Sequence, residues 1–154
     1  MSKHWNNREV GQVADWLRMA LAGRTDARQS AKRMRDRAIA LLISRNGLST
    51  GQITAMKMGD VDLGTGLATV LSSRARRREI VEMDADVSEA MRRWMAMRPM
   101  MAKRGVTELF VSLHTTKAYR APGSRMTDRG VRAMMAAYCV EYAEALSLHG
   151  SRAE

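Results

Sequence analysis

The stretch that most constrains how this chain can fold runs from residue 35 to residue 62 and reads RDRAIALLISRNGLSTGQITAMKMGDVD. Apolar residues fill positions 38–43, a pattern that predicts a helix buried over most of its circumference. Gly47 suits the left-handed conformation that ends a helix. Ser49 followed three residues later by Gln52 is a capping-box pattern, so a second helix starts at once. Two helices around a tight glycine turn are therefore the predicted centre of the fold.

The flanking segments predict further helices and one β-hairpin. In the first part of the chain we expect a helix at 8–22 capped by Asn6 or Asn7, followed by a polar connection at 24–34. Two strands at 67–71 and 78–83 form the hairpin, and the next helix, at 86–101, is capped by Asp84 and ended or bent by Pro99. A strand or extended segment at 109–113 and a helix from Thr127 to about Leu148 complete the chain. The fold class is α+β, mostly α-helical with a small antiparallel β-hairpin sheet. We expect one domain over 1–154, with 1–7 and 149–154 frayed.

The charge of the chain favours a polyanionic partner. Twenty-six Lys and Arg stand against 16 Asp and Glu, which gives a formal net charge of +10 and a pI of about 10.8. Nucleic acid is the commonest partner of such a protein, and a basic protein without such a partner is the alternative. The single cysteine, Cys139, excludes an internal disulfide and fits a reducing cytoplasm. With no membrane-length apolar run and no signal-peptide region, we expect a cytoplasmic protein.

Cationic side chains gather in two places. The tip of the predicted hairpin carries Arg74, Arg76, Arg77 and Arg78. Guanidinium groups so crowded repel one another, whereas opposite a phosphate backbone each can form charge-assisted hydrogen bonds. The second group surrounds the start of the last helix, whose free amides themselves favour phosphate, and comprises Lys117, Arg120, Arg125, Thr127, Arg129 and Arg132. A solvated basic surface is the alternative in both places.

No metal or cofactor site is predicted. His4 and His114 have no companions at metal-ligand spacing, and one cysteine cannot build a zinc site. No phosphate-cradling glycine loop is visible.

Residues 35–62 resemble the first signature box of the tyrosine recombinases (phage integrase family), which reads approximately R-D-R-A, an apolar helix, T-G-L-R-x-x-E-L and D-x-D. The resemblance covers roughly residues 8–149 and implies the fold of that family's catalytic domain. It also implies that the arginine of G-L-R grips the scissile phosphate, but this chain has Ser49 there. Arg74 takes the position of the hairpin lysine that acts as general acid, and arginine is a poor proton donor.

The end of the chain partly resembles the family's second signature box, H-x-L-R. His149 and Arg152 keep the spacing of that box, while Ser151 replaces its leucine, and a frayed tail is the alternative. In the family a nucleophilic tyrosine lies further on, and no tyrosine follows here. Tyr119 falls in a predicted loop, and Tyr138 and Tyr142 fall on a helix core stripe. The family's separate N-terminal core-binding domain is also missing from the sequence.

From these departures we expect a non-catalytic, sequence-specific DNA-binding protein on an integrase fold, a transcriptional regulator or accessory factor of a mobile genetic element, and not an enzyme. Besides the two cationic groups, Arg45, Thr50 and Lys57 are expected at the DNA. The partners are double-stranded DNA and either a second copy or a full-length recombinase. The alternatives are a remnant recombinase that needs a partner to supply the tyrosine, and an inhibitor of an active integrase.

Overall fold

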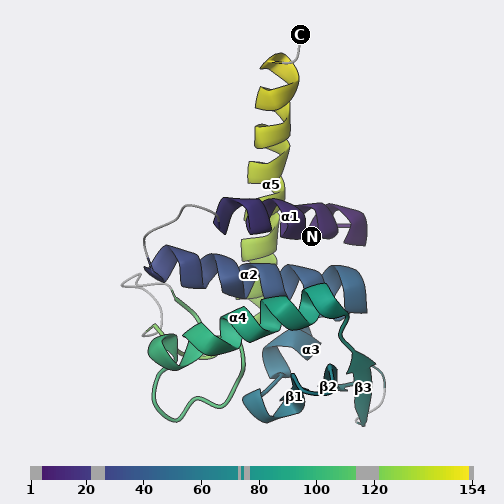
Figure 1. Cartoon of the computed structure of the whole chain (residues 1–154), viewed down its shortest axis with the longest axis vertical. Coiled ribbons are helices and arrows are strands. Elements are labelled where there is room, and N and C mark those ends of the chain that lie inside the picture. The colour runs from purple at the N-terminus through teal and green to yellow at the C-terminus, as the bar shows by residue number, and fades with distance from the viewer. Residues whose placement is uncertain (1–4, 22–26, 73, 75–76, 114–121, 153–154) are drawn as a thin grey trace.

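The structure, a computed structural model, describes residues 5–21, 27–72, 74, 77–113 and 122–152. Its elements in chain order (Figure 1) are α1 (Asn7–Leu21), α2 (Ala27–Asn46), α3 (Thr50–Ala55), the short 3-10 helix η1 (Met58–Asp60), β1 (Val61–Asp62), β2 (Leu67–Leu71), β3 (Arg78–Glu82), α4 (Ala85–Met101) and α5 (Asp128–Arg152). The predicted fold class, mostly helical with a small antiparallel sheet, is confirmed.

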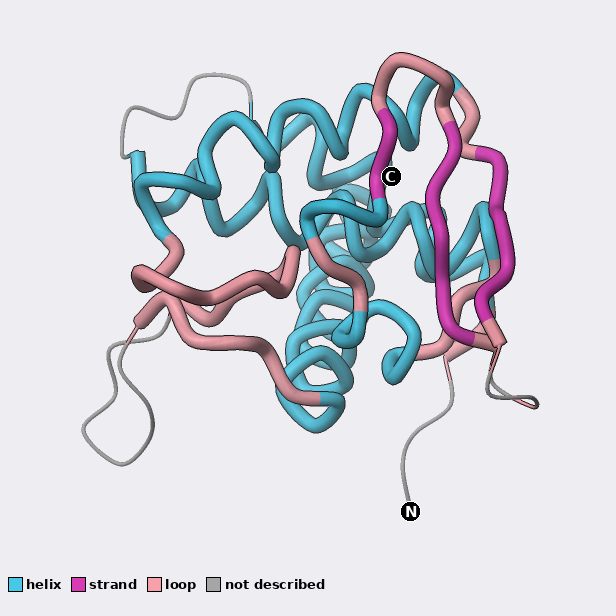
Figure 2. The backbone as a smooth tube through the Cα atoms, turned by 90° about the horizontal axis from the view of Figure 1, so that it is seen from below, coloured by secondary structure: helices cyan, strands magenta, loops and turns pink. Residues whose placement is uncertain are grey.

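Helix α2 is the centre of the helical part. It packs against α1 on one side and α4 on the other, and α5 crosses behind these helices (Figure 1). The C-terminal half of α5 projects beyond α1, while α3 and the sheet lie at the opposite end of the molecule (Figure 1). The strands lie in the order β1-β2-β3, all antiparallel, with Val61 opposite Ala68 and Thr69 opposite Ile80 (Figure 2).

The core is built from aliphatic, methionine and a few aromatic side chains. Ile39, Met91, Trp94 and Met135 are fully buried. The indole N–H of Trp94 donates to the Leu109 carbonyl at 2.9 Å, so this large side chain is buried without an unsatisfied donor. Contributions from α2, α4 and α5 thus form one continuous core.

The predicted helix starts are confirmed by their hydrogen bonds. The side-chain oxygens of Asn6, Asp84 and Thr127 accept backbone N–H groups three residues on, at 2.8, 2.9 and 3.0 Å. Ser49 forms the complete capping box before α3. Gly47 has the predicted positive φ of 65°, a conformation that side chains disfavour.

The beginning of α2 differs from the prediction. Residues 27–34 were expected in a polar connection but form the first two turns of α2. Ala31 is fully buried there, and Lys32 pairs with Asp36 one turn on, at 3.0 Å. An ion pair at this spacing and one small buried residue support a helix despite its polar surface.

The predicted end of the helix at 86–101 is confirmed, since α4 ends at Met101, two residues after Pro99. Two other segments differ. Residues 109–113 form no strand: the region holds only the isolated bridges Lys57–Glu108 and Val111–Arg125. Helix α5 continues to Arg152 instead of ending near Leu148.

Buried polar groups tie α2 to α5. The Asp36 carboxylate accepts the hydroxyl of Tyr138 at 2.5 Å, and Arg35 and Lys32 pair with the same carboxylate. Arg35 also donates to the carbonyl of Val111 at 2.9 Å. Because Asp36 is fully buried, this pairing is what makes its charge tolerable.

Candidate functional site

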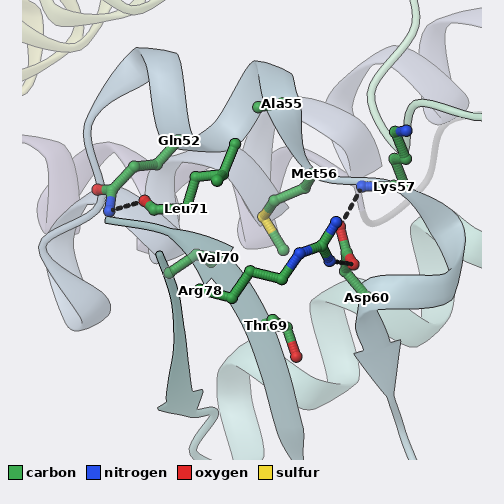
Figure 3. A pocket seen from close by; sticks show the side chains of 9 residues that line it. All are labelled: Gln52, Ala55, Met56, Lys57, Asp60, Thr69, Val70, Leu71 and Arg78. Atoms are coloured by element: carbon green, nitrogen blue, oxygen red, sulfur yellow. Dashed lines mark hydrogen bonds and ion pairs between the residues drawn. The ribbon is translucent and has the colours of Figure 1, made fainter. Parts of the chain in front are cut away.

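The start of α3 and the β-hairpin meet at Gln52. Its backbone N–H donates to Ser49 Oγ at 3.1 Å, and its side-chain oxygen accepts the Ser49 N–H at 2.9 Å. Its side-chain nitrogen donates to the carbonyl of Leu71, the last residue of β2, at 2.7 Å (Figure 3). One side chain thus closes the capping box and holds the strand that leads into the arginine-rich tip.

A second contact fastens the other strand of the hairpin. Arg78 Nη1, at the start of β3, lies 3.0 Å from Asp60 Oδ1, and the other carboxylate oxygen of Asp60 accepts the Lys57 N–H at 2.9 Å (Figure 3). Between this pair and Gln52 lies a hollow of about 120 Å³. The hairpin is therefore held at both of its strands.

A third contact joins α3 to the start of α5. The buried hydroxyl of Thr54 donates to Asp128 Oδ1 at 2.9 Å, and Asp128 follows the capping residue Thr127. A carboxylate in the first turn of a helix is stabilised by the helix dipole. Asp128 also places a negative charge beside a helix start that the sequence predicted to attract phosphate.

The described cationic residues of the predicted groups are all exposed. They are Arg74, Arg77 and Arg78 on the hairpin, Lys57 after α3, and Arg125, Arg129 and Arg132 around the start of α5. The three contacts above bring their elements together. Arg76, Lys117 and Arg120 lie outside the described residues. His149 and Arg152 belong to the last turns of α5, and their side chains are not among those described.

Three other predicted positions have identified surroundings. Arg45 is paired with Asp84 at 2.9 Å and Asp86 at 3.4 Å. Thr50 is half-buried in the first turn of α3, and Ser49 is exposed. The Arg45 pairs are themselves half-exposed, and such pairs are weak, so a phosphate could compete for this guanidinium.

The two described tyrosines of α5 lie on the predicted core stripe. Burial and the neighbouring Asp36 carboxylate raise the pKa of Tyr138 far above its ordinary value, so the phenol stays protonated. Tyr142 packs against the ring of Trp16, with ring centres 5.9 Å apart. The Tyr138 hydroxyl is committed to the buried Asp36 carboxylate, and Tyr119 lies outside the described residues.

The sequence did not reveal Asp60, Asp128 or the bond from Gln52 to Leu71 as parts of this site. An acid after a capping threonine is visible in the sequence, and so is the capping box. Thr54, the partner of Asp128, lies 74 residues away in the sequence, and Leu71, the partner of the Gln52 side chain, lies 19 residues away. Only the tertiary structure brings them together.

Within the described ranges, no group of His, Cys, Asp and Glu is arranged to hold a metal ion. Among the same residues, no helix has the length and apolar character needed to cross a membrane.

Comparison with known proteins identifies relatives of this chain. The model of a family described as "Phage integrase family" matches residues 20–154. A tyrosine recombinase XerC of Pelotomaculum thermopropionicum is 27% identical over 106 residues, which cover 68% of this chain and 33% of that protein. A tyrosine recombinase XerC of Vibrio cholerae is 29% identical over 106 residues, covering 68% and 34%. These matches span about a third of the relatives' length.

A solved structure shares the fold. The crystal structure of XerA recombinase superimposes with a TM-score of 0.59 at 19% identity, over 90% of this chain and 42% of that one. The predicted resemblance to the catalytic domain of the tyrosine recombinases is thereby confirmed.

The expectation that the chain is not an enzyme is contradicted by these matches. The family model and the relatives point to recombinases, which are enzymes. That expectation rested on single positions, such as Ser49 and Arg74, and on the lack of a suitable tyrosine nucleophile. The region that matches the relatives covers only about a third of their length.

Proposed function

Because the chain belongs to the phage integrase family, we propose that it binds duplex DNA and takes part in site-specific recombination. The binding face consists of the hairpin, α3 with Lys57, and the start of α5. The observation that carries the proposal is the set of three contacts Gln52–Leu71, Arg78–Asp60 and Thr54–Asp128, which lock the cation-bearing elements to one another. Because the elements are already joined, little backbone entropy is lost when their exposed cations meet a phosphate backbone.

The exposure and charge of the side chains decide which of them we assign to each stretch of the DNA backbone. Arg74 and Arg77 at the tip bind phosphates, with Arg76 beside them in the sequence. The exposed Arg125, Arg129 and Arg132 bind a second stretch of backbone. Lys117 and Arg120, from the preceding segment of the chain, are assigned to that same stretch.

The residues between these two groups, and the end of the chain, complete the assignment. Lys57 and Thr50 contact DNA between the two groups, and Arg45 can join them by leaving its carboxylate partners. His149 and Arg152 are assigned to phosphate only by the resemblance.

The chemistry requires a contribution from outside this face. Ser49 presents a hydroxyl where the resemblance implies a guanidinium, so the face can orient a phosphate but neutralises it less. The nucleophile would be a tyrosine outside the described residues. A second copy of the chain or a full-length recombinase is the proposed partner in strand exchange.

The same face also suits an accessory or regulatory factor of a mobile genetic element, working on bacterial nucleoid DNA. Ser49 is the observation that favours this second role, because the capping box keeps the fold of the face without that guanidinium. The two roles share DNA binding and differ in strand cleavage.

Selection from a random duplex library, followed by a cleavage assay, tests the proposal. We expect one enriched sequence, and covalent or nicked products on suicide substrates of that sequence when a full-length recombinase is added. Enrichment without any products in the mixture would favour the accessory role. A library that shows no enrichment would contradict sequence-specific binding.

A further inference from the structure

A hollow of about 410 Å³ lies between α2, α5 and the segment that contains Ser112. Small-molecule sites in proteins occupy about 300–1,000 Å³, so its size suits a small ligand. Among the described residues that line it, none is a cation assigned to DNA. The hollow is therefore separate from the proposed DNA-binding face.

The polar part of this hollow has an excess of positive charge. Lys32 and Arg35 line it and share the fully buried Asp36 carboxylate. Burial and that carboxylate raise the pKa of Tyr138 far above its ordinary value, so its phenol adds no negative charge. The guanidinium carbon of a third cation, Arg33, lies 5.9 Å from the centre of the Tyr138 ring. Three cations thus gather around Asp36 and Tyr138, with one buried carboxylate to balance them.

Lys32 has a hydrogen-bond donor left for a ligand. An ammonium group has three N–H donors, and Lys32 uses one for Asp36 Oδ2 at 3.0 Å and one for the Tyr138 hydroxyl oxygen at 2.9 Å. It has no third partner within the described part of the chain, and its side chain is 30% exposed. A free ammonium donor beside excess positive charge favours an anionic group, because a charge-assisted hydrogen bond is stronger than a neutral one.

Apolar side chains form the rest of the wall. Met126 precedes α5, and Ala133, Met134 and Ala137 lie on α5. Methionine side chains adapt to the shape of an apolar ligand. We infer that this hollow binds a small molecule with one carboxylate and an apolar chain, the carboxylate at Lys32 and the chain along the methionines and alanines.

Glu141 limits the charge that such a ligand can carry. Its exposed carboxylate lines the same hollow, and it has no ion pair within the described ranges. A phosphate or a dicarboxylate would bring a second negative charge close to Glu141, whereas a single carboxylate can stay at Lys32. The hollow therefore favours a monocarboxylate.

Isothermal titration calorimetry of the whole chain with octanoate tests the inference. At about pH 7.5 a carboxyl group with an ordinary pKa of about 4 is ionised. Octanoate should bind saturably, and 1-octanol, which has the chain without the charge, should bind at least about tenfold more weakly. Acetate, which has the charge without the chain, should bind at least about tenfold more weakly as well.

Substitutions on both sides of the hollow locate the ligand. Lys32→Gln should weaken octanoate binding by about tenfold, and Glu141→Gln, which removes the opposing charge, should strengthen it by about two- to fivefold. Ala137→Trp fills the hollow from an exposed helix position and leaves the ion cluster unchanged, so it should abolish binding. Ala143→Trp, exposed on the same helix away from the hollow, is the matched control and should bind octanoate as the wild type does.

The assay contains no DNA, so its outcome does not depend on the proposed function. The inference is overturned if the wild type shows no saturable binding of octanoate. It is also overturned if folded Ala137→Trp binds octanoate as tightly as Ala143→Trp, since the ligand would then lie elsewhere. Equal affinities for octanoate and 1-octanol would overturn the role of Lys32, even if Lys32→Gln does not fold.

Discussion

Replacing Ser49 by arginine tests whether position 49 of the proposed DNA-binding face lies close to a DNA phosphate. Ser49 is exposed at the turn between α2 and α3, so a longer side chain has room. The substitution removes the Oγ that accepts the Gln52 N–H at 3.1 Å, and leaves the reciprocal bond from the Ser49 N–H to Gln52 Oε1 at 2.9 Å. Losing half of the capping box should lower the free energy of unfolding by about 1 kcal/mol.

The same substitution should strengthen the electrostatic part of DNA binding. One added guanidinium neutralises one more phosphate, which steepens the slope of log K against log salt by about 0.9. Between 50 and 200 mM salt this amounts to an additional loss of affinity of about 3.5-fold in the variant, compared with the wild type. Affinity at the lower salt concentration should accordingly rise.

Fluorescence anisotropy of a labelled duplex, titrated at several salt concentrations, measures this slope. Ser49→Gln is the matched control, because it removes the same hydroxyl cap and adds a long neutral side chain. The reasoning is refuted if Ser49→Arg and Ser49→Gln have the same slope while both are folded, since position 49 would then lie away from the phosphates.

Two other substitutions test the surroundings of the face. Asp128→Asn keeps an oxygen that can accept the Thr54 hydroxyl and removes a negative charge beside the start of α5. The affinity for duplex DNA should therefore rise by about two- to fivefold. An unchanged affinity would place Asp128 outside the interface. Tyr138→Phe removes the hydrogen bond to buried Asp36 and should cost about 1.5–3 kcal/mol in urea unfolding. Because the folded pKa of Tyr138 is raised, the stabilisation from its phenol is complete below the ordinary pKa of about 10 and declines above it. The wild type should therefore lose stability above that pH more steeply than Tyr138→Phe, and parallel curves would contradict the cause given for the shift.

The helix starts could be predicted from the sequence because a cap depends on residues three positions apart. Asn6, Ser49, Asp84 and Thr127 all cap as expected. The extended segment at 109–113 was harder, because its pairing is set by distant partners: the Leu109 N–H donates to the Met56 carbonyl at 2.8 Å. Local patterns carry no information about such a partner.

The same limit applies to the site. Charge alone located the exposed arginines of the hairpin and of the α5 start. The sequence did not show that Asp128 lies against Thr54, or that Arg45 is shared by two carboxylates of the α4 start. The prediction of no enzymatic activity was wrong because it weighed individual substitutions, whereas the family relationship depends on the whole matched region.

The salt dependence of duplex binding tests the central claim most directly. If the hairpin and the α5 start both bind phosphates, the wild-type slope should be about −3 or steeper, and the double variant Arg74→Ala/Arg77→Ala should make it shallower by about 1.8. Arg8→Ala, an exposed arginine on α1 at the other side of α2 from the sheet, should change it little (Figure 1). A wild-type slope near zero, or an equal slope in the double variant, would contradict the proposed DNA-binding face.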